Sequence, residues 1–276
     1  MDNRIICGDC YKTMRTFLND LSGCVDMFLF SPPYDNIRLY KNTWNPDREG
    51  NSFFIYDITW CMYELLCDGG VGCVVVQDGT AKRSKSGSVW RWVLEAEKCG
   101  LNIFEVLIYK RPGRPGAWWS KRFRVDHEYI IIFVKGDNGP KYFSKDHMLI
   151  PAKYAGKKWS GTQRLTDGTL IKKEGIVKDR KCPGTILDYA SSNTEGNKLK
   201  MNHPATMPDK LAEDMIQCFT SGGDLIIDPF CGSGTTLVAA EKLGRKYIGI
   251  DNNSYYCSLS KERIESETKI KGGQNV

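Results

Sequence analysis

The stretch "LIIDPFCGSGTTLVAAEKLGRKYIGID", residues 225–251, decides the fold of this chain. It contains a short apolar strand, an acidic residue, a Gly-x-Gly turn, a helix, a second strand and a second acidic residue. This pattern is half of a nucleotide-binding βαβ unit, in which glycines let the backbone turn sharply and approach a ligand closely. Gly232 and Gly234 supply that turn, and Asp251 is placed at a strand end to accept hydrogen bonds from ribose hydroxyls.

A dinucleotide fingerprint has a third glycine at the position where this chain has Leu237. A pyrophosphate at the helix N-terminus requires G-x-G-x-x-G, whereas a ligand with a ribose and no phosphate does not. S-adenosylmethionine is such a ligand. A lone Gly-x-Gly is usually a plain turn, but Asp228 before it and Asp251 after it favour a cofactor site.

Short apolar runs alternate with helical stretches on both sides of this unit, which predicts an α/β fold around a mostly parallel sheet. Between residues 136 and 200 the alternation weakens, so we expect a separate module inserted there. The expected strands are residues 4–7, 25–30, 71–77, 104–110, 129–134, 225–227 and 247–250, and the expected helices are residues 11–18, 54–66, 88–98, 208–220, 235–243 and 254–267.

The composition is that of an ordinary soluble protein, with 276 residues and 41% hydrophobic content. Neither a secretory leader nor an apolar run near the ~18 residues of a membrane span is evident, so we expect a cytoplasmic location. Residues 136–200 hold 13 Lys/Arg and 7 Asp/Glu, while the rest of the chain holds 26 of each. All of the net charge of +6 therefore lies in the insert, which is either a solvated module or a surface for a polyanion.

Eleven cysteines are scattered through apolar segments, which is typical of buried thiols in a reducing compartment rather than of disulfides. Cys7 and Cys10 form the single C-x-x-C motif, which suggests a redox dithiol or half of a zinc site. With no second C-x-x-C and only three histidines, we expect no metal.

A second motif, "FSPPYDN", ends the apolar run of residues 25–30. Pro-Pro after a strand is often a simple stop, but sheets of this class bind ligands beyond the C-terminal ends of their strands. The amino group of a base is a poor nucleophile, and Ser31 Oγ and the Pro32 carbonyl are acceptors that favour its pyramidal form. Pro32 and Pro33 stiffen the loop, and Tyr34 offers a stacking face for a flipped base.

Together, "SPPY" (31–34), "NHPATMP" (202–208) and "DPFCGSG" (228–234) resemble the β-class of exocyclic-amino DNA methyltransferases. In that family the catalytic tetrapeptide comes first, a target-recognition region follows and the cofactor loop comes last, a circularly permuted motif order that this chain shares. The resemblance covers nearly all of residues 1–135 and 201–268. It implies a Rossmann-like S-adenosylmethionine-dependent domain built from residues 1–135 and 201–276, with a target-recognition insert at residues 136–200.

The resemblance also implies roles for single residues. Asp9 is expected near the adenine amino group of the cofactor, and Asp251 is expected to hold the ribose, where a glutamate is frequent in the family. Cys231 is interpreted as a small side chain rather than a nucleophile. The other implied cofactor residues are Asp228, Phe230, Gly232 and Gly234 in the loop and His203 and Pro204 beside the pocket, and the implied catalytic residues are Ser31, Pro32, Pro33 and Tyr34.

Two segments that mix basic residues with tryptophan, 82–92 and 110–124, suit phosphate contacts and a strand-separating loop. For the first segment, a solvated loop with core tryptophans is an equal alternative. The insert is expected to contact double-stranded DNA, and its candidates for gripping the backbone are Lys157, Lys158, Arg164, Lys172 and Lys173.

In this family a serine at the first tetrapeptide position is more typical of cytosine-N4 enzymes, and Asp or Asn of adenine-N6 enzymes. We therefore predict N4-methylcytosine as the product, with N6-methyladenine as the alternative. Other classes stay open: an RNA or protein methyltransferase, a non-catalytic nucleic-acid-binding module and, more weakly, a disulfide oxidoreductase. A cognate restriction endonuclease is a candidate second partner, and the sequence leaves the oligomeric state and recognition site undefined.

Overall fold

The chain folds into two units, residues 1–143 with 185–276 and residues 144–184. The structure is a computed structural model, and it describes residues 2–33, 52–81, 84–111, 123, 125–189 and 207–268. The second unit lies inside the insert expected at residues 136–200, whose boundaries stay a prediction.

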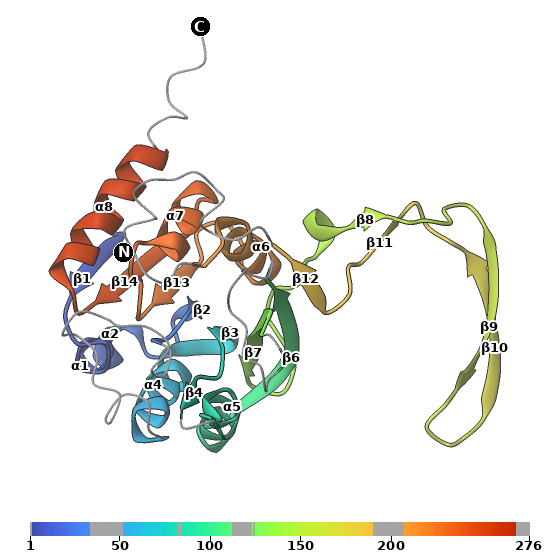
Figure 1. Ribbon diagram of the computed structural model, residues 1–276, viewed down its shortest axis with the longest axis horizontal. Coiled ribbons are helices and arrows are strands. Elements are labelled where there is room, and N and C mark those ends of the chain that lie inside the picture. The colour runs from blue at the N-terminus through green and yellow to red at the C-terminus, as the bar shows by residue number, and fades with distance from the viewer. Residues whose placement is uncertain are drawn as a thin grey trace, which may run out of the picture. The chain divides into compact units, whose positions relative to one another are not determined.

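The first unit is built on an eight-stranded mixed sheet with the order β1-β14-β13-β2-β3-β7-β6-β12 (Figure 1). Strand β7 is antiparallel to both of its neighbours, and the other paired strands are parallel. The predicted α/β class is therefore confirmed. The strands are β1 (Arg4–Cys7), β2 (Val25–Phe30), β3 (Leu66–Val76), β6 (Leu101–Lys110), β7 (His127–Lys135), β12 (Ile186–Asp188), β13 (Leu225–Asp228) and β14 (Lys246–Asp251).

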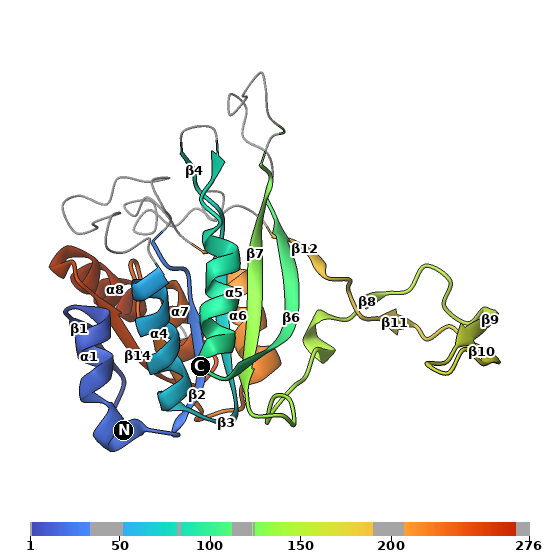
Figure 2. The same cartoon turned by 90° about the horizontal axis from the view of Figure 1, so that it is seen from below.

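Helices cover both faces of this sheet (Figures 1 and 2). One layer contains α1, α2, α4 and α5, and the opposite layer contains α6, α7 and α8. Among the helices of the described ranges, none has the length and apolarity needed to span a bilayer. The helices are α1 (Cys10–Thr16), α2 (Leu18–Leu21), α4 (Ser52–Leu65), α5 (Ser88–Lys98), α6 (Asp209–Phe219), α7 (Thr235–Lys242) and α8 (Ser254–Thr268).

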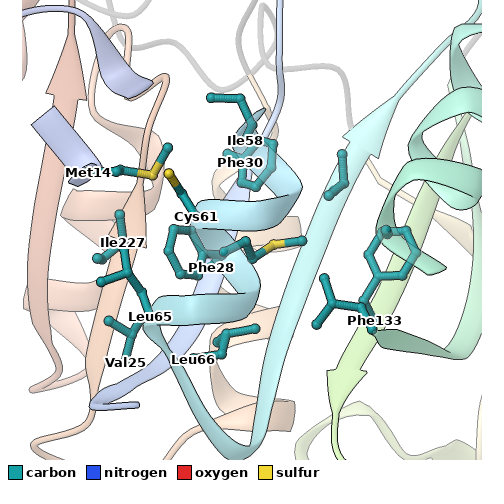
Figure 3. Close-up of a cluster of buried hydrophobic side chains, with 14 of the residues drawn as sticks. Met14, Val25, Phe28, Phe30, Ile58, Cys61, Leu65, Leu66, Phe133 and Ile227 are labelled. Atoms are coloured by element: carbon teal, nitrogen blue, oxygen red, sulfur yellow. The ribbon is translucent and has the colours of Figure 1, made fainter. Parts of the chain in front are cut away.

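Strand β2 is central, and helices cover it on both faces, which explains its continuous apolar sequence. Phe28 and Phe30 pack toward α4, where Ile58 and Leu65 meet them in a buried cluster (Figure 3). Burial of each such side chain stabilises the fold by about 1.5–3 kcal/mol. The cluster fixes β2, and with it the position at which the chain leaves the sheet after Phe30.

Strand β3 begins five residues before the predicted strand at 71–77. The residues Asp68-Gly69-Gly70, which are typical of a turn, lie within this strand. Gly69 has a φ of +70°, and the register between β2 and β3 shifts beside it. A positive φ at glycine lets the strand absorb this irregularity without ending.

The second unit contains strands that the sequence did not predict. Its main element is an antiparallel hairpin of β9 (Lys158–Arg164) and β10 (Leu170–Ile176). These segments are polar and lack a buried face, so apolar alternation could not reveal them. The shorter elements are η1 (Asp146–Met148), β8 (Ile150–Pro151) and β11 (Arg180–Lys181) in this unit, and β4 (Thr80–Ala81) and β5 (Ser84–Lys85) in the first.

Candidate active site

Four neighbouring parallel strands, β1, β14, β13 and β2, end at one edge of the sheet. Asp9 follows β1, and Asp251 ends β14. Asp228 ends β13, and Ser31 follows β2. Because adjacent strands lie about 4.8 Å apart, the row spans about 15 Å. The fold therefore lines up four predicted site residues along an edge long enough for an extended ligand.

The loop between β13 and α7 is fixed by hydrogen bonds of its own backbone. The Phe230 N–H donates to Asp228 Oδ1 at 2.9 Å, and the Gly234 N–H donates to the Cys231 carbonyl at 2.7 Å. The Cys231 N–H donates to the Ile250 carbonyl of β14 at 2.9 Å. The loop, residues 228–235, is thus attached to the neighbouring strand as well as to itself, and below we call it the cofactor loop.

Both glycines of the Gly-x-Gly turn have a left-handed backbone. Gly232 has a φ of +49°, and Gly234 has a φ of +81° and precedes the first turn of α7. A Cβ atom on Gly234 would lie 3.0 Å from Ser260 Cβ of α8. Gly234 is therefore required both by its backbone conformation and by close packing.

Leu237 stands where a dinucleotide-binding motif has its third glycine, and in this chain the glycine at the contact of helix and strand is Gly249 of β14. Leu237 and Cys231 pack onto Gly249, where a Cβ atom would lie 2.4 Å from Leu237 Cδ1 and 3.1 Å from Cys231 Sγ. The helix and strand still approach closely, but the glycine stands in the strand. Burial also raises the pKa of the Cys231 thiol well above its ordinary value, which supports its interpretation as a packing residue.

The carboxylate of Asp251 holds the cofactor loop and keeps acceptor capacity. Its Oδ2 accepts from the Gly232 N–H at 3.0 Å, and its Oδ1 accepts from the Asn253 N–H at 2.9 Å. Burial raises the pKa of Asp251, and these two hydrogen bonds oppose that rise. Because a carboxylate has about four lone-pair sites, Asp251 can accept hydrogen bonds from two further hydroxyl groups.

Asp228, the first residue of the same loop, is a buried carboxyl group. Burial raises its pKa to about 7, while hydrogen bonds with Thr236 and the Phe230 N–H lower it and the nearby Asp251 raises it further. The cost of ionising a buried acid explains this value. We interpret Asp228 as a residue that shapes the loop.

The cofactor loop is tied to the end of β2, where the predicted catalytic tetrapeptide begins. The ring centroids of Phe230 and Phe30 lie 5.6 Å apart. Phe30 in turn contacts Trp92 of α5 edge-on, with a centroid distance of 5.6 Å. The Thr236 hydroxyl donates to the Leu29 carbonyl at 3.2 Å. The segments that carry the two motifs, about 200 residues apart in sequence, therefore lie side by side at this edge of the sheet.

The tetrapeptide itself leaves the sheet directly after Phe30. Pro32 is buried, while Ser31 and Pro33 are half-buried. The remaining predicted site residues, Tyr34, His203 and Pro204, lie outside the described residues.

Asp9 stands at the other end of the row, between β1 and α1. Its carboxylate caps α1 by accepting from the Lys12 N–H at 2.9 Å, and the adjacent Gly8 N–H donates to the Asp251 carbonyl at 2.9 Å. Nearby, burial raises the pKa of the Cys10 thiol, so it is not an activated thiolate. In the described ranges, no group of three or more His, Cys, Asp or Glu side chains is arranged as a metal site.

Sequence reasoning missed a buried arginine that supports the cofactor loop from α8. Arg263 is 0% exposed, and its Nη1 donates to the Ser233 carbonyl at 2.8 Å. Its Nε donates to Glu267 Oε1 at 2.9 Å, and its Nη2 lies 3.4 Å from Asp209 Oδ1. One turn earlier on α8, Ser260 Oγ donates to the Gly232 carbonyl at 2.6 Å.

Glu267 extends this network to α7. It accepts from Lys242 at 2.8 Å, and although burial raises its pKa, the Lys242 hydrogen bond and the Arg263 charge lower it overall. The sequence signal was the spacing of Ser260, Arg263 and Glu267, which are three and four residues apart and share a helix face. A polar set at that spacing is also typical of a solvated face, so tertiary contacts were needed to identify it.

The two segments that mix basic residues with tryptophan have different outcomes. Trp92 is buried in the core against Phe30, so the core alternative holds for that residue, whereas Trp90 is exposed and contacts Tyr129. Most of the second segment, residues 112–122 and 124, lies outside the described residues.

A family model described as DNA methylase matches residues 25–262. "Orphan methyltransferase M.BamHII" of Bacillus amyloliquefaciens is 32% identical over 250 residues, which are 88% of this chain and 89% of that protein. "Type II methyltransferase M.BglII" of Bacillus subtilis is 28% identical over 273 residues, which are 96% of this chain and 69% of that protein.

Two solved structures share the fold. PvuII DNA methyltransferase (cytosine-N4-specific) superposes with a TM-score of 0.70 at 19% identity, covering 98% of this chain and 92% of that chain. TTHA0409 of Thermus thermophilus, complexed with S-adenosyl-L-methionine, superposes with a TM-score of 0.65 at 22% identity, covering 96% of each chain.

Proposed function

The chain belongs to the N6/N4 DNA methylase family, and from this premise we propose that it methylates the N4 amino group of cytosine in double-stranded DNA. One observation carries the proposal: the cofactor loop and the first turn of α7 are in direct contact with the strand that leads into Ser-Pro-Pro-Tyr, through the Phe230–Phe30 rings and the Thr236–Leu29 hydrogen bond. A methyl donor and a target amino group bound at these motifs would meet at the same sheet edge.

The methyl donor is S-adenosylmethionine, the ligand named for the TTHA0409 complex. The residues of the site fit such a molecule. Asp9 and Asp251 lie along one edge, and such carboxylates repel phosphate but suit hydroxyl donors and a cationic sulfonium, while the buried Asp228 between them shapes the loop. Leu237 occupies the position at which a pyrophosphate site needs glycine.

Individual roles follow from this placement. We assign Asp251 to the ribose hydroxyls, because it keeps acceptor capacity, and Asp9 to the adenine end at the edge of the row. Phe230 lines the pocket, and Gly232 and Gly234 let the backbone approach the methionine portion. His203 and Pro204 stay predictions as residues that flank the pocket.

When bound, the cofactor supplies a methyl group on a positively charged sulfur. The amino nitrogen of the flipped base would form a bond to that carbon while the carbon–sulfur bond breaks, so that the sulfur would leave as a neutral thioether and one amino proton would pass through the acceptors that hold it to water. Ser31 Oγ and the Pro32 carbonyl accept the amino hydrogens and so favour a pyramidal, nucleophilic nitrogen. Pro33 stiffens the turn, and Tyr34 provides the stacking face.

The choice of cytosine rests on Ser31, through its resemblance to the cytosine-N4 tetrapeptide. Adenine N6 is the alternative, because both amino groups pose the same hydrogen-bonding problem and the family includes both chemistries. We also propose that residues 136–200 form the target-recognition insert and that the motif order is circularly permuted. A cognate restriction endonuclease and a cytoplasmic location stay predictions, since one relative is named a type II methyltransferase and another an orphan.

Nucleoside mass spectrometry of duplex DNA treated with the protein and S-adenosylmethionine tests the proposal. We expect N4-methylcytosine as the product. Detection of N6-methyladenine instead would show that adenine is the target base. Methylation of RNA or peptide with none on DNA would reject the DNA substrate. Absence of S-adenosylmethionine binding in calorimetry would favour a non-catalytic binding module.

Two variants separate chemistry from binding. Ser31→Ala is expected to lower kcat by about 10²–10³-fold, the usual effect of removing one preorganised hydrogen-bonding group. Tyr34→Ala is expected to abolish methylation because the flipped base loses its stacking surface. Both variants should retain S-adenosylmethionine affinity in calorimetry, and a parallel loss of cofactor affinity would contradict the assigned roles.

A further inference from the structure

The hairpin of β9 and β10 has two faces of different character. Its strands pair in register from Lys158 with Ile176 to Arg164 with Leu170, and side chains alternate between the faces. The open face carries Lys158, Ser160, Thr162, Arg164, Leu170, Lys172, Glu174 and Ile176, and the tryptophan face carries Trp159, Gly161, Gln163, Ile171, Lys173 and Gly175.

The tryptophan face is partly covered by the hairpin itself. A Cβ atom on Gly175 would lie 3.1 Å from Trp159 Nε1, so the indole lies over the glycine of the opposite strand. Gly175 and, further along the same face, Ile171 are half-exposed. On the open face, by contrast, all eight residues are exposed. The open face is therefore the more exposed of the two, since Ile171 and Gly175 of the tryptophan face are not fully exposed.

The distribution of charge along the chain indicates what kind of molecule the open face binds. Residues 144–184 hold 10 of the 39 Lys/Arg and 4 of the 33 Asp/Glu, so the other residues hold 29 of each. The whole net charge of +6 thus belongs to this unit. The open face carries three cations, Lys158, Arg164 and Lys172, against one carboxylate, Glu174. This surface suits a polyanion rather than an apolar protein surface.

The shape of the hairpin suits a duplex. A two-stranded ribbon fits the major groove of B-DNA, which is about 12 Å wide, and seven residues of strand extend about 24 Å. A ribbon without a third strand or a covering helix is marginal by itself, so a partner that lines one face stabilises it. Its exposed side chains include the types that read base edges: Arg and Lys for guanine, Glu for the cytosine amino group and Thr for several bases.

We propose that the open face of the β9–β10 hairpin enters the major groove of duplex DNA and reads the target sequence. The inference rests on the proposed function, because it takes duplex DNA as the substrate, and it adds which face and which residues determine specificity. Arg164, Lys172 and Thr162 are the central reading residues, since Thr162 pairs with Lys172 across the strands and Arg164 follows on the same face. Lys173 points to the other face, where only phosphate contacts are open to it.

Lys172 and Lys173 provide a matched pair, because they are adjacent, equally charged, exposed and on opposite faces. We expect Lys172→Ala to weaken binding of a duplex that carries the target sequence by about 5- to 100-fold. We also expect it to relax the sequence context of methylation at one position. Lys173→Ala should weaken all duplexes alike, by less than about fivefold, and leave the context unchanged. Arg164→Ala should behave as Lys172→Ala.

Fluorescence anisotropy at fixed salt measures the affinities, and sequencing of modified bases measures the context. Cofactor affinity, unchanged in every variant, serves as the check that the first unit is intact. Equal effects of Lys172→Ala and Lys173→Ala, or a context change caused by Lys173→Ala alone, would overturn the face assignment while the wild-type protein still methylates DNA. A wild-type protein that methylates no DNA would instead reject the proposed function. A smaller oligomer in gel filtration for the open-face variants would identify a second copy of the chain as the occupant and overturn the inference.

Discussion

The cofactor loop and the β9–β10 hairpin are both short, glycine-containing segments, yet they are held in opposite ways. The loop is fixed from three sides, by β14, β2 and α8, and its support includes the fully buried Arg263. The hairpin is held by its own cross-strand pairing and by one indole over a glycine. A loop that must present one geometry to one cofactor needs rigid support. A two-stranded ribbon that binds in a groove needs less support from the protein, because the bound partner covers one of its faces.

The largest effect is expected at Arg263. Arg263→Met should lower the free energy of unfolding by about 3–5 kcal/mol, because it removes a fully buried cation that pairs with Asp209 and Glu267, of which Glu267 keeps Lys242. It should also weaken S-adenosylmethionine binding, since the Ser233 carbonyl loses its donor. Urea unfolding and calorimetry measure the two effects. By comparison, Lys158→Ala on the hairpin should change stability by less than about 0.5 kcal/mol.

Arg245 is the control for Arg263, because its guanidinium also donates hydrogen bonds to backbone carbonyls. Its guanidinium donates to the Thr220 and Leu243 carbonyls, both at 2.6 Å, at the start of β14 and thus far from the cofactor edge. Arg245→Met should reduce stability but leave cofactor affinity within about twofold. If both variants weakened cofactor binding equally, Arg263 would have no specific role in shaping the cofactor loop.

Two glycines of positive φ test the same contrast at the backbone. Gly234 of the cofactor loop has a φ of +81°, and Gly168 of the hairpin turn has a φ of +89°. Gly234→Ala should cost about 2–4 kcal/mol, because left-handed strain adds to the contact with Ser260. Gly168 has open space around it, so Gly168→Ala should cost at most about 1–2 kcal/mol of strain. Equal losses in urea unfolding would show that Ser260 does not constrain the loop.

Per pH unit, the smallest effect is a pH dependence at Asp228. Its folded pKa of about 7 exceeds the unfolded value of about 3.9, so the native state binds more protons between these values. The free energy of unfolding therefore falls as the pH rises from 4 to 7, by at most about 1.4 kcal/mol per pH unit from this group. Asp228→Asn should remove this slope in urea unfolding between pH 5 and pH 8.

The hairpin again offers the control. Asp167 is an exposed carboxylate whose pKa is lowered by a hydrogen bond from the Thr169 N–H. Its stabilisation is lost only as the pH falls through that lowered value, below the window from pH 5 to pH 8. Asp167→Asn should keep the wild-type slope. Parallel profiles for Asp228→Asn and the wild-type protein would contradict the elevated pKa of Asp228.

Segments of strong periodicity were predictable in detail. Helix α5 has the predicted bounds, Ser88–Lys98, and β2 the predicted bounds, Val25–Phe30, because each has an unbroken pattern and a clear boundary residue. The start of β3 was not predictable, since Asp68-Gly69-Gly70 is typical of a turn when read locally. Pairing with the neighbouring strand overrides that local preference.

Within the candidate site, the residues that follow strand ends were predictable and their support was not. Asp228, Asp251 and Ser31 each follow or end an apolar run, which marks them as residues of a sheet edge. Arg263 lies in the middle of a polar helix, where an arginine is usually solvated. Its partner at Ser233 is 30 residues away and is a backbone carbonyl, which no side-chain pattern reveals.

The sequence by itself determined the α/β class, the Gly-x-Gly turn and the acidic strand ends, because these features express local requirements of the backbone at single positions. Only the tertiary structure decided which strands are neighbours, where β7 reverses, that Arg263 and Ser260 hold the cofactor loop and which face of the hairpin stays open. Those features depend on contacts between distant segments. The free energy of such contacts arises only when the whole sheet assembles, so no short stretch of sequence encodes them alone.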